Sequence, residues 1–421
     1  MNESQSHSTN GLRPKIVLLN QTFHPDVVAT AQYLTSLGEA LAATGGDVTA
    51  ISSRRAYDAP GRRFPRREVH RDIKIERVAA AGLGKGSKWK RIVDFGSFFF
   101  STAVRLFLRP RADIVVALTS PPLIAALAAV YRRLRGGKFI YWVMDLNPDE
   151  ALAAGWLKPG LVSWCLERIS RATMRSADAI IVLDRFMQAR VLAKGAAPDR
   201  VHMLPPWSFD GSVYFNPRGR ERFRERHGLA DKFVVMYSGN HSPCHPLDTL
   251  LDGAVALSGD DRFHFAFVGG GSEYEKLRRA AEEGGLTNVS FLPYQPLDTL
   301  SESLSAADLQ VVVMGEPFVG TIHPCKLYSI LAVNAPVLYI GPDESHILDA
   351  LGDSRSTSPY AHIAFGDTPA LISYLETLVE DWDPQPVREA NPLADQFAAA
   401  RVLPRLVSVI LENCQVGMPG A

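Results

Sequence analysis

Short apolar strands alternate with helices along most of this chain of 421 residues, and this alternation constrains the fold more than any other feature of the sequence. Strands separated by helices are typical of parallel sheets that carry helices on both faces. The first half predicts strands at 15–19, 47–52, 114–118, 139–143 and 179–183, and helices at 31–43, 124–134 and 161–175. The second half predicts strands at 233–237, 263–268, 289–292, 309–314 and 337–340, and helices at 247–257, 274–283 and 326–332. We therefore expect an α/β protein with two Rossmann-like sheets.

The alternation is interrupted once, at residues 204–217, where the sequence LPPWSFDGSVYFNP is rich in proline, glycine and aromatic residues. Because a single hydrophobic core stops growing at about 250–300 residues, we expect this segment to connect two domains that face across a deep cleft. The predicted division has a disordered polar leader at 1–12, a first domain at 13–207 and a second at 208–395. The apolar helix within 396–421 is expected to pack back on the first domain.

The composition excludes several classes of protein. The four cysteines are widely spaced and form no Cys-x-x-Cys pair, which argues against a disulfide framework or a zinc site. The first dozen residues lack an apolar signal core. The sequence contains no run of about 18 uncharged apolar residues, which is the length needed to span a bilayer. We expect a cytoplasmic protein that is soluble or peripheral on the cytoplasmic face of the inner membrane.

A triple glycine at 269–271 lies between a predicted strand and the predicted helix 274–283. Ser272 and Glu275 have the spacing of a capping box, which would place the glycines at the amino end of that helix. Exposed backbone N–H groups and the helix dipole favour an anion such as a diphosphate there. The alternative is a tight turn that binds no ligand.

Two further loops join strands to helices in the second half, at 238–241 and 315–324. Since the carboxyl ends of parallel strands share one edge of a sheet, all three loops should open on the same side. Lys326 follows the third loop and can add a full positive charge to the site, although a lysine at a helix start is often a solvated surface residue. Three such loops in succession favour a phosphate site.

Four segments of the second half carry a family resemblance: YSGN (237–240), FVGGGSEYEKL (267–277), VSFLPYQP (289–296) and HPCKLYSILAVNAPVLY (323–339). They resemble the donor-binding domain of family 4 glycosyltransferases, which have the two-domain GT-B fold. Residues 19–52 are similar to the opening strand, acceptor-side loop and helix of that family. The resemblance extends from Lys15 to about Ala400 and implies a hexosyltransferase that uses a nucleotide-sugar.

The resemblance also implies roles for individual residues. The catalytic roles fall on Lys326 beside the phosphates, on Asp145 beside the reacting sugar, and on His24 in the opposing loop. Asp145 could instead cap a helix or be a solvated loop residue. The donor-binding roles fall on Gly239, Asn240, His241, Gly269, Gly270, Gly271, Leu292, Tyr294, Lys326 and Leu327.

The sequence departs from the family pattern in two ways. Many members carry two glutamates eight residues apart, but Thr321 and Ser329 stand here. We keep both in the expected donor site, together with Glu316, which could substitute for a missing carboxylate or be an exposed loop residue. Residues 29–31 are Ala-Thr-Ala where the family often has a glycine pair. A retaining transfer assisted by the leaving diphosphate needs positive charge and N–H donors more than a protein base, so we expect activity.

No metal or other cofactor is expected, because the nucleotide-sugar is a co-substrate. The Asp381-Trp382-Asp383 segment is a short motif in a polar stretch, and we interpret it as a surface turn. No Gly-x-Gly-x-x-Gly motif follows the first strand, which disfavours hydride transfer.

The segment from Arg54 to Arg111 is basic, with 16 Lys or Arg against 5 Asp or Glu, although the whole chain has a formal net charge of zero. It places cations beside Trp89, Phe95 and the run 98–100, which suits the surface of an anionic membrane. The alternative is a core helix with solvated arginines. No nucleic-acid recognition motif is present.

The sequence thus predicts a retaining glycosyltransferase that moves a sugar from a nucleotide diphosphate donor, UDP-linked by preference, to a lipid-linked or saccharide acceptor in polysaccharide biosynthesis. One alternative is a UDP-N-acetylglucosamine 2-epimerase, which shares the fold and needs no acceptor. Another is a catalytically silent GT-B partner protein, suggested by Thr321 and Ser329.

Overall fold

The computed structural model describes residues 13–57, 61–82, 88–209, 212–352, 360–380, 382–383, 388 and 391–415. The chain folds into two compact units, one formed by 1–142, 169–181 and 406–421 and the other by 143–168 and 182–405. The predicted leader lies outside the described residues, and the predicted domain boundaries stay a prediction. Residues 143–168 and 182–207, which we expected in the first domain, group with the second unit.

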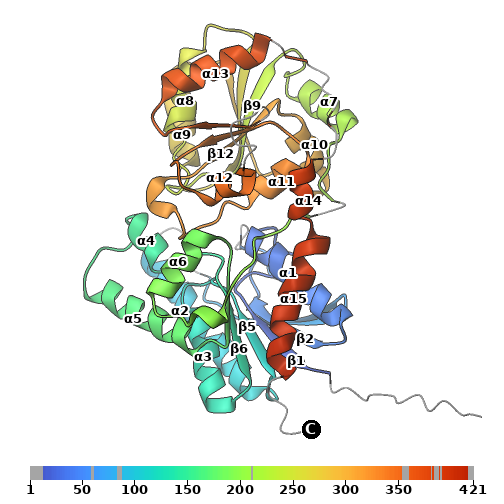
Figure 1. The fold of residues 1–421 in the computed structure, drawn as a ribbon, viewed down its shortest axis with the longest axis vertical. Coiled ribbons are helices and arrows are strands. Elements are labelled where there is room, and N and C mark those ends of the chain that lie inside the picture. Colours follow the sequence, from blue (N-terminus) through green and yellow to red (C-terminus); the bar gives the residue numbers. More distant parts are fainter. Residues whose placement is uncertain are drawn as a thin grey trace, which may run out of the picture. The chain divides into compact units, whose positions relative to one another are not determined.

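The first sheet has eight strands in the order β3-β4-β2-β1-β5-β6-β7-β8 (Figure 1). They are β1 (Lys15–Leu19), β2 (Asp47–Ser53), β3 (Arg67–His70), β4 (Ile73–Val78), β5 (Ile114–Ala117), β6 (Lys138–Trp142), β7 (Ala179–Val182) and β8 (Val201–Met203). The pairs from β4 through β7 are parallel, while β3 pairs with β4 in the antiparallel direction. The parallel sheet was predicted; the β3–β4 hairpin was not.

The helices that belong to this part of the chain are α1 (Ala29–Ala43), α2 (Lys88–Leu108), α3 (Ile124–Arg135), α4 (Asp149–Ala153), α5 (Leu161–Ser176) and α6 (Arg185–Ala193). Helix α1 illustrates the sequence rules. Leu34, Leu37 and Leu41 recur at helical spacing and are all buried. The helix stops before Gly45, whose φ of +90° suits glycine and ends the helical path.

The second sheet has six strands in the order β11-β10-β9-β12-β13-β14, and every pair is parallel. They are β9 (Phe233–Asn240), β10 (Phe263–Gly270), β11 (Val289–Leu292), β12 (Leu309–Val313), β13 (Val337–Ile340) and β14 (Tyr360–Ile363). Continuous burial along β12 and β13 is what a parallel sheet covered on both faces requires.

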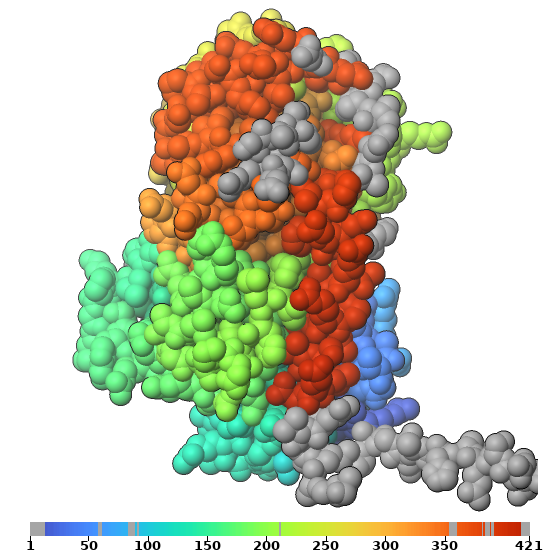
Figure 2. All heavy atoms as spheres, viewed as in Figure 1, coloured from blue at the N-terminus to red at the C-terminus, as the bar shows by residue number. Residues whose placement is uncertain are grey.

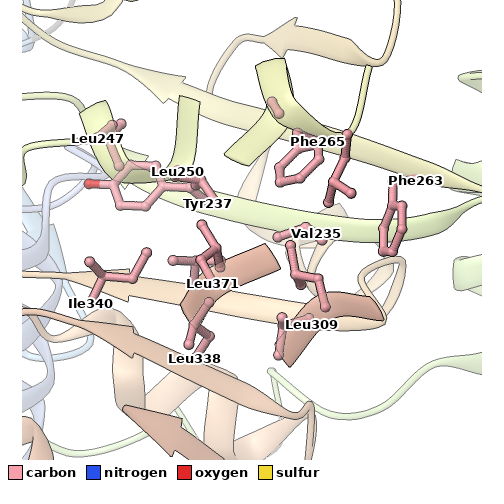
Figure 3. Close-up of a cluster of buried hydrophobic side chains, with 14 of the residues drawn as sticks. Val235, Tyr237, Leu247, Leu250, Phe263, Phe265, Leu309, Leu338, Ile340 and Leu371 are labelled. Carbon is pink, nitrogen blue, oxygen red and sulfur yellow. The ribbon is translucent and has the colours of Figure 1, made fainter. Parts of the chain in front are cut away.

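The helices of the second part are α7 (Pro217–Arg226), α8 (Asp248–Ala256), α9 (Tyr274–Glu283), α10 (Leu300–Ser305), α11 (Lys326–Ala332), α12 (His346–Leu351), α13 (Thr368–Glu380) and α14 (Pro392–Gln396). Figure 3 shows one core cluster, in which side chains of four strands meet Leu250 of α8 and Leu371 of α13. In Figure 2 the atoms of α13, coloured orange-red, form a continuous area of surface at the top of the view.

The last helix, α15, runs from Ala399 to Gln415 and contains Pro404. Residues 406–415 belong to the first compact unit, while the start of the helix belongs to the second. Among the described residues, none of the helices combines the length and the apolar character that a membrane span requires.

Candidate active site

Strands β9, β10 and β12 are adjacent and parallel, so the loops that follow them leave from the same edge of the second sheet. Gly239 at the end of β9 is directly opposite Gly269 of β10. The prediction that the three loops share one edge is confirmed. This edge is also where open α/β sheets bind their ligands.

The glycines at this edge are required by close backbone packing. A Cβ on Gly269 would lie 2.0 Å from the Gly239 carbonyl oxygen, and a Cβ on Gly271 would lie 2.1 Å from the His241 carbonyl oxygen. Their φ angles of +128° and +149° also disfavour any L side chain. The two loops therefore pass each other backbone to backbone, where a side chain would separate them.

The predicted capping box at the start of α9 is wrong. The helix begins at Tyr274, and no side chain caps it; the hydroxyl of Ser272 bonds instead to the neighbouring Glu273 carboxylate, 3.4 Å away. The Glu275 carboxylate accepts a hydrogen bond from Arg278 on the exposed face of the helix. The helix start is held by backbone, since the Glu273 N–H donates to the His241 carbonyl at 3.1 Å.

Lys326 is the first residue of α11, and its Nζ atom is buried without a hydrogen-bond partner among the described residues. The ammonium lies 3.5 Å from the centroid of the Tyr237 ring. It also lies 2.7 Å from the place that a Cβ on Gly239 would occupy. Burial lowers the pKa of Lys326 well below its ordinary value, because no counter-charge offsets the lost hydration. The predicted lysine is therefore directly beside the glycine edge.

Two histidines surround this lysine, and only the first was predicted. The His241 Nδ1 donates to the Gly239 carbonyl at 3.1 Å, and burial followed by the charge of Lys326 lowers the pKa of His241 to about 4. The His245 Nδ1 donates to the Val313 carbonyl at 2.7 Å, and the same two causes lower the pKa of His245 to about 3. Both imidazoles are neutral at physiological pH, so neither adds a positive charge to this edge. The sequence signal that could have indicated His245 was its spacing of four residues from His241, which was already a predicted donor residue.

The other predicted donor residues differ in whether their side chains are accessible to a ligand. Tyr294 is exposed and its hydroxyl donates to the Gly270 carbonyl at 3.0 Å, so its ring lies over the glycine edge. Leu292 ends the neighbouring strand β11 and is half-buried, and Asn240 is exposed at the end of β9. Leu327, by contrast, is fully buried in a hydrophobic cluster, so only its backbone is available to a ligand.

Thr321 and Ser329, which replace the two glutamates of the family pattern, and Glu316, the suggested substitute, occupy different environments. Thr321 is buried; its hydroxyl donates to the Phe318 carbonyl at 2.9 Å, and its own carbonyl accepts from the Leu146 N–H at 2.7 Å. Glu316 is exposed in a short 3-10 turn before it. Ser329 is half-buried on α11, one turn after Lys326. Thr321 thus has a structural use for its side chain.

Asp145 follows β6 in a loop of the second unit, next to the bond between Leu146 and Thr321. Burial, and then the negative charge of Glu150, raise the pKa of Asp145 to about 8. Both carboxyl groups also contribute, after burial, to the raised pKa of Cys244, so they act on the loop that follows β9. At neutral pH Asp145 is therefore mainly a protonated acid, which can donate a hydrogen bond.

His24 belongs to the first unit, and its ring stacks on His70 with the centroids 3.7 Å apart. Burial and the neighbouring His70 lower the pKa of His24 below its ordinary value. The backbone of His24 is fixed at both ends, because its N–H donates to Thr35 at 3.2 Å and its carbonyl accepts from Arg77 at 2.7 Å. A neutral imidazole in this position can accept or donate a hydrogen bond.

The basic segment divides into structural and exposed parts. Arg77 is buried and pairs with Glu68 at 2.7 Å, while Arg105 and Arg109 both pair with Glu76, at 2.7 and 3.1 Å. These arginines stabilise the first sheet and its helix through ion pairs, so they are not the solvated arginines that the alternative supposed. Helix α2 nevertheless exposes a stripe of large apolar side chains at helical spacing: Trp89, Ile92, Val93, Phe100, Val104 and Leu108.

The fold matches several solved structures. It matches the sucrose-phosphate synthase of Thermosynechococcus elongatus with a TM-score of 0.74 and 15% identity, over 96% of this chain and 100% of that one. It also matches Anabaena HepE in complex with UDP-glucose, with a TM-score of 0.65 and 14% identity, over 96% and 98% of the two chains. The chain is therefore a GT-B protein, as its sequence predicted.

Sequence comparison places it more narrowly. Residues 29–207 match the family described as a glycosyl transferase 4-like domain. The chain is 26% identical to a putative colanic acid biosynthesis glycosyl transferase, WcaI of Escherichia coli K12, over 331 residues, which cover 76% of this chain and 81% of that protein. Residues 29–207 are thus similar to a glycosyl transferase 4-like domain, and these similarities support a glycosyltransferase enzyme.

Proposed function

We propose that the enzyme transfers a sugar, with retention of configuration, from a UDP-linked donor whose diphosphate binds at the glycine edge of the second sheet. The observation that carries the proposal is the Lys326 ammonium, which is buried beside Gly239 and has no hydrogen-bond partner among the described residues. A buried charge without a partner is costly, and a bound diphosphate would supply the missing counter-charge.

The proposed chemistry depends on charge stabilisation at the leaving group. As the bond between the sugar and the diphosphate breaks, negative charge grows on the phosphate oxygens. Lys326 would neutralise that charge, and backbone N–H groups of the loops after Gly239 and Gly269 would donate hydrogen bonds to it. Because the diphosphate can itself take the acceptor's proton, this scheme requires neither a metal nor a protein base.

Asp145 and His24 are proposed to position the substrates. With its pKa raised to about 8, Asp145 would donate a hydrogen bond to a hydroxyl of the sugar or acceptor at neutral pH. His24 carries a lowered pKa and would act as a neutral hydrogen-bonding group on the acceptor side. Neither role needs the carboxylates that Thr321 and Ser329 replace.

The choice of UDP is supported by the HepE complex, in which a protein of the same fold holds UDP-glucose. The exposed ring of Tyr294, over Gly270 and next to Leu292, is a suitable surface for a base. The polysaccharide role is supported by the similarity to a putative colanic acid biosynthesis enzyme.

The acceptor is proposed to be lipid-linked or a saccharide, with α2 touching an anionic membrane surface. The support is the exposed apolar stripe of that helix, in which Trp89 is 59% and Phe100 69% exposed, inside a basic segment. Co-sedimentation with anionic vesicles tests this contact.

The donor site is tested by Lys326→Met, which keeps the length of the side chain and removes its charge. A hydrogen bond to a charged group contributes about 1.5–3 kcal/mol, so we expect UDP affinity, measured by isothermal titration, to fall about 10- to 150-fold. Turnover with a donor sugar should fall about 10²- to 10³-fold.

Lys276→Met is the matched control, since Lys276 is an exposed lysine on α9. It should change UDP affinity less than twofold. Unchanged UDP affinity and turnover in Lys326→Met would remove this lysine from the mechanism. Tighter binding of GDP or ADP than UDP by the wild type would overturn the choice of base, and isomer formation from UDP-N-acetylglucosamine without an acceptor would favour an epimerase.

A further inference from the structure

Three polar side chains from distant parts of the sequence meet in the interior of the second unit. Asp184 precedes α6, His323 precedes α11, and His346 is the first residue of α12. The His323 Nδ1 lies 2.8 Å and the His346 Nδ1 3.9 Å from the same oxygen of Asp184, Oδ2. One ligand atom from each residue lies within 4.8 Å of the others.

The buried His346 ring is the unexplained member of this cluster. Its side chain is 3% exposed, and neither ring nitrogen has a hydrogen-bond partner among the described residues. The ring stacks on His323 with centroids 3.8 Å apart. Leaving a buried polar group unsatisfied costs about 1–3 kcal/mol, and native proteins rarely keep one unless an ion, a water or a function requires it.

We propose that Asp184, His323 and His346 form a binding site for one divalent transition-metal ion, of which Zn²⁺ is the best candidate. Two imidazole nitrogens and one carboxylate oxygen are a ligand set that zinc uses, with a fourth position left for water. The ion would satisfy the free nitrogen of His346 and neutralise the buried Asp184 carboxylate together. The sequence carried no sign of this site, because the ligands do not form a short motif.

The surroundings of His323 fit this role. Its Nε2 lies 2.6 Å from the hydroxyl of the buried Tyr328, and histidines that bind metals usually hold an outer partner on their second nitrogen. If Nδ1 binds the metal, the ring proton moves to Nε2 and is donated to the Tyr328 oxygen, so the imidazole stays neutral. Asp184 keeps its other oxygen, Oδ1, as the acceptor for the Met187 N–H at the start of α6.

Metal binding requires a modest local adjustment. Ligands about 2.1 Å from a tetrahedral ion are about 3.4 Å apart, so the widest separation in the cluster, which is within 4.8 Å, must shorten by up to about 1.4 Å. The ring planes of His323 and His346 are inclined by only 24°, and the ring centroids are 3.8 Å apart. Because the lone pair of an imidazole nitrogen lies in the ring plane, the two rings in this orientation do not both point a nitrogen at one ion. Rotation of the His346 ring about its Cβ–Cγ bond would aim one nitrogen at the site, and no hydrogen bond among the described residues opposes that rotation.

The ion would have a structural role. It would tie the starts of α6, α11 and α12 together, and α11 begins with Lys326. The site therefore adds to the proposed donor chemistry without taking part in a step of it. Its test below has readouts that do not depend on transfer activity.

The experiment uses untagged full-length protein, stripped with a chelator, dialysed and titrated with Zn²⁺. We expect one Zn²⁺ per chain by elemental analysis, and a visible absorption band when Co²⁺ replaces it. His346→Phe keeps the ring stacking and removes the ligand, and Asp184→Asn keeps the acceptor for Met187 and removes the charge. Each should weaken metal affinity by at least about 100-fold, and Tyr328→Phe by about 10- to 100-fold.

His264→Phe is the matched control, because His264 also has a buried, unpartnered Nε2 but is not part of the cluster. It should bind Zn²⁺ like the wild type. The proposal is overturned if the wild type binds no Zn²⁺ after titration, or if Asp184→Asn and the wild type bind it equally. Should His346→Phe fail to fold, the Asp184→Asn result decides.

Discussion

Replacing Gly269 by alanine puts a methyl group where the neighbouring loop already lies. The new Cβ would be 2.0 Å from the Gly239 carbonyl oxygen and 2.9 Å from its carbonyl carbon. Neither atom belongs to a flexible side chain, so the backbone of β9 or β10 must move. Contacts below 3.0 Å are essentially never seen for real Cβ atoms, so the displacement is at least about 1 Å.

The expected loss of stability has two parts. Holding alanine at a φ near +128° costs about 1–3 kcal/mol. Forcing extra volume into a packed region costs a further 1–3 kcal/mol or so. We therefore expect Gly269→Ala to destabilise the second unit by about 2–6 kcal/mol, and to weaken UDP binding because the two loops separate at the proposed diphosphate site.

Gly270→Ala is the control, one residue along the same strand. Its Cβ would meet only the Tyr294 ring at 3.3 Å, which is exposed and can move, and its φ is not in the left-handed region. Its stability should change by less than about 1 kcal/mol. Urea unfolding followed by tryptophan fluorescence measures both variants, with each transition analysed separately because the chain has two compact units. Equal midpoints for the two alanine variants would refute the packing argument.

Two further predictions concern charge and surface. Because burial raises the pKa of Asp145 from 3.8 to about 8, the folded state favours its protonated form. The resulting contribution to the free energy of unfolding is fully present below pH 3.8 and is lost as the pH rises through 8. The loss is less than about 1.4 kcal/mol per pH unit. Thermal midpoints of Asp145→Asn should lack this part of the pH dependence, and parallel curves for variant and wild type would contradict it. On α2, the double change Trp89→Ser and Phe100→Ser should reduce co-sedimentation with phosphatidylglycerol vesicles severalfold and leave UDP affinity unchanged. Leu134→Ser on α3 is the control and should change neither co-sedimentation nor UDP affinity. Undiminished co-sedimentation of the double variant would remove α2 from the membrane contact.

The regular elements were largely predictable because their signals are local. Strands β1, β11 and β13 and helices α9 and α11 have the predicted bounds, since each is a short apolar or amphipathic run between breaking residues. The β3–β4 hairpin was missed because its many arginines looked like a solvated segment. The alternation of apolar and polar residues at the start of IKIERV (73–78) was the sequence signal available for it, and in the structure it corresponds to alternating burial.

The site was predictable only at positions that the order of strand, loop and helix fixes. The glycines and Lys326 follow from the order of strand, loop and helix, and the structure brings them together at one edge. The capping box failed because a backbone bond from Glu273 to His241, on a different loop, fixes the start of α9. Such a bond leaves no side-chain record in the sequence.

The interior polar cluster was not predictable by the same reasoning. Asp184 and His323 are 139 residues apart, and nothing in their spacing indicates a contact. Only the fold brings the start of α6 to the loop before α11. The same applies to His245, whose neutral state depends on burial and on the charge of Lys326.

The absence of the family's two glutamates has a consequence for the lysine. Among the described residues, Lys326 makes no ion pair, and the aromatic ring of Tyr237 is the group that faces its ammonium at close range. An aromatic ring attracts a cation less strongly than a carboxylate does, and it carries no net charge to repel phosphate. A glutamate at position 329, three residues further along α11, would both neutralise the ammonium and oppose the diphosphate. With Ser329 there instead, the proposed diphosphate would be the first full counter-charge that Lys326 meets among the described residues, so under this proposal the loss of the carboxylate would strengthen the electrostatic attraction for the leaving group.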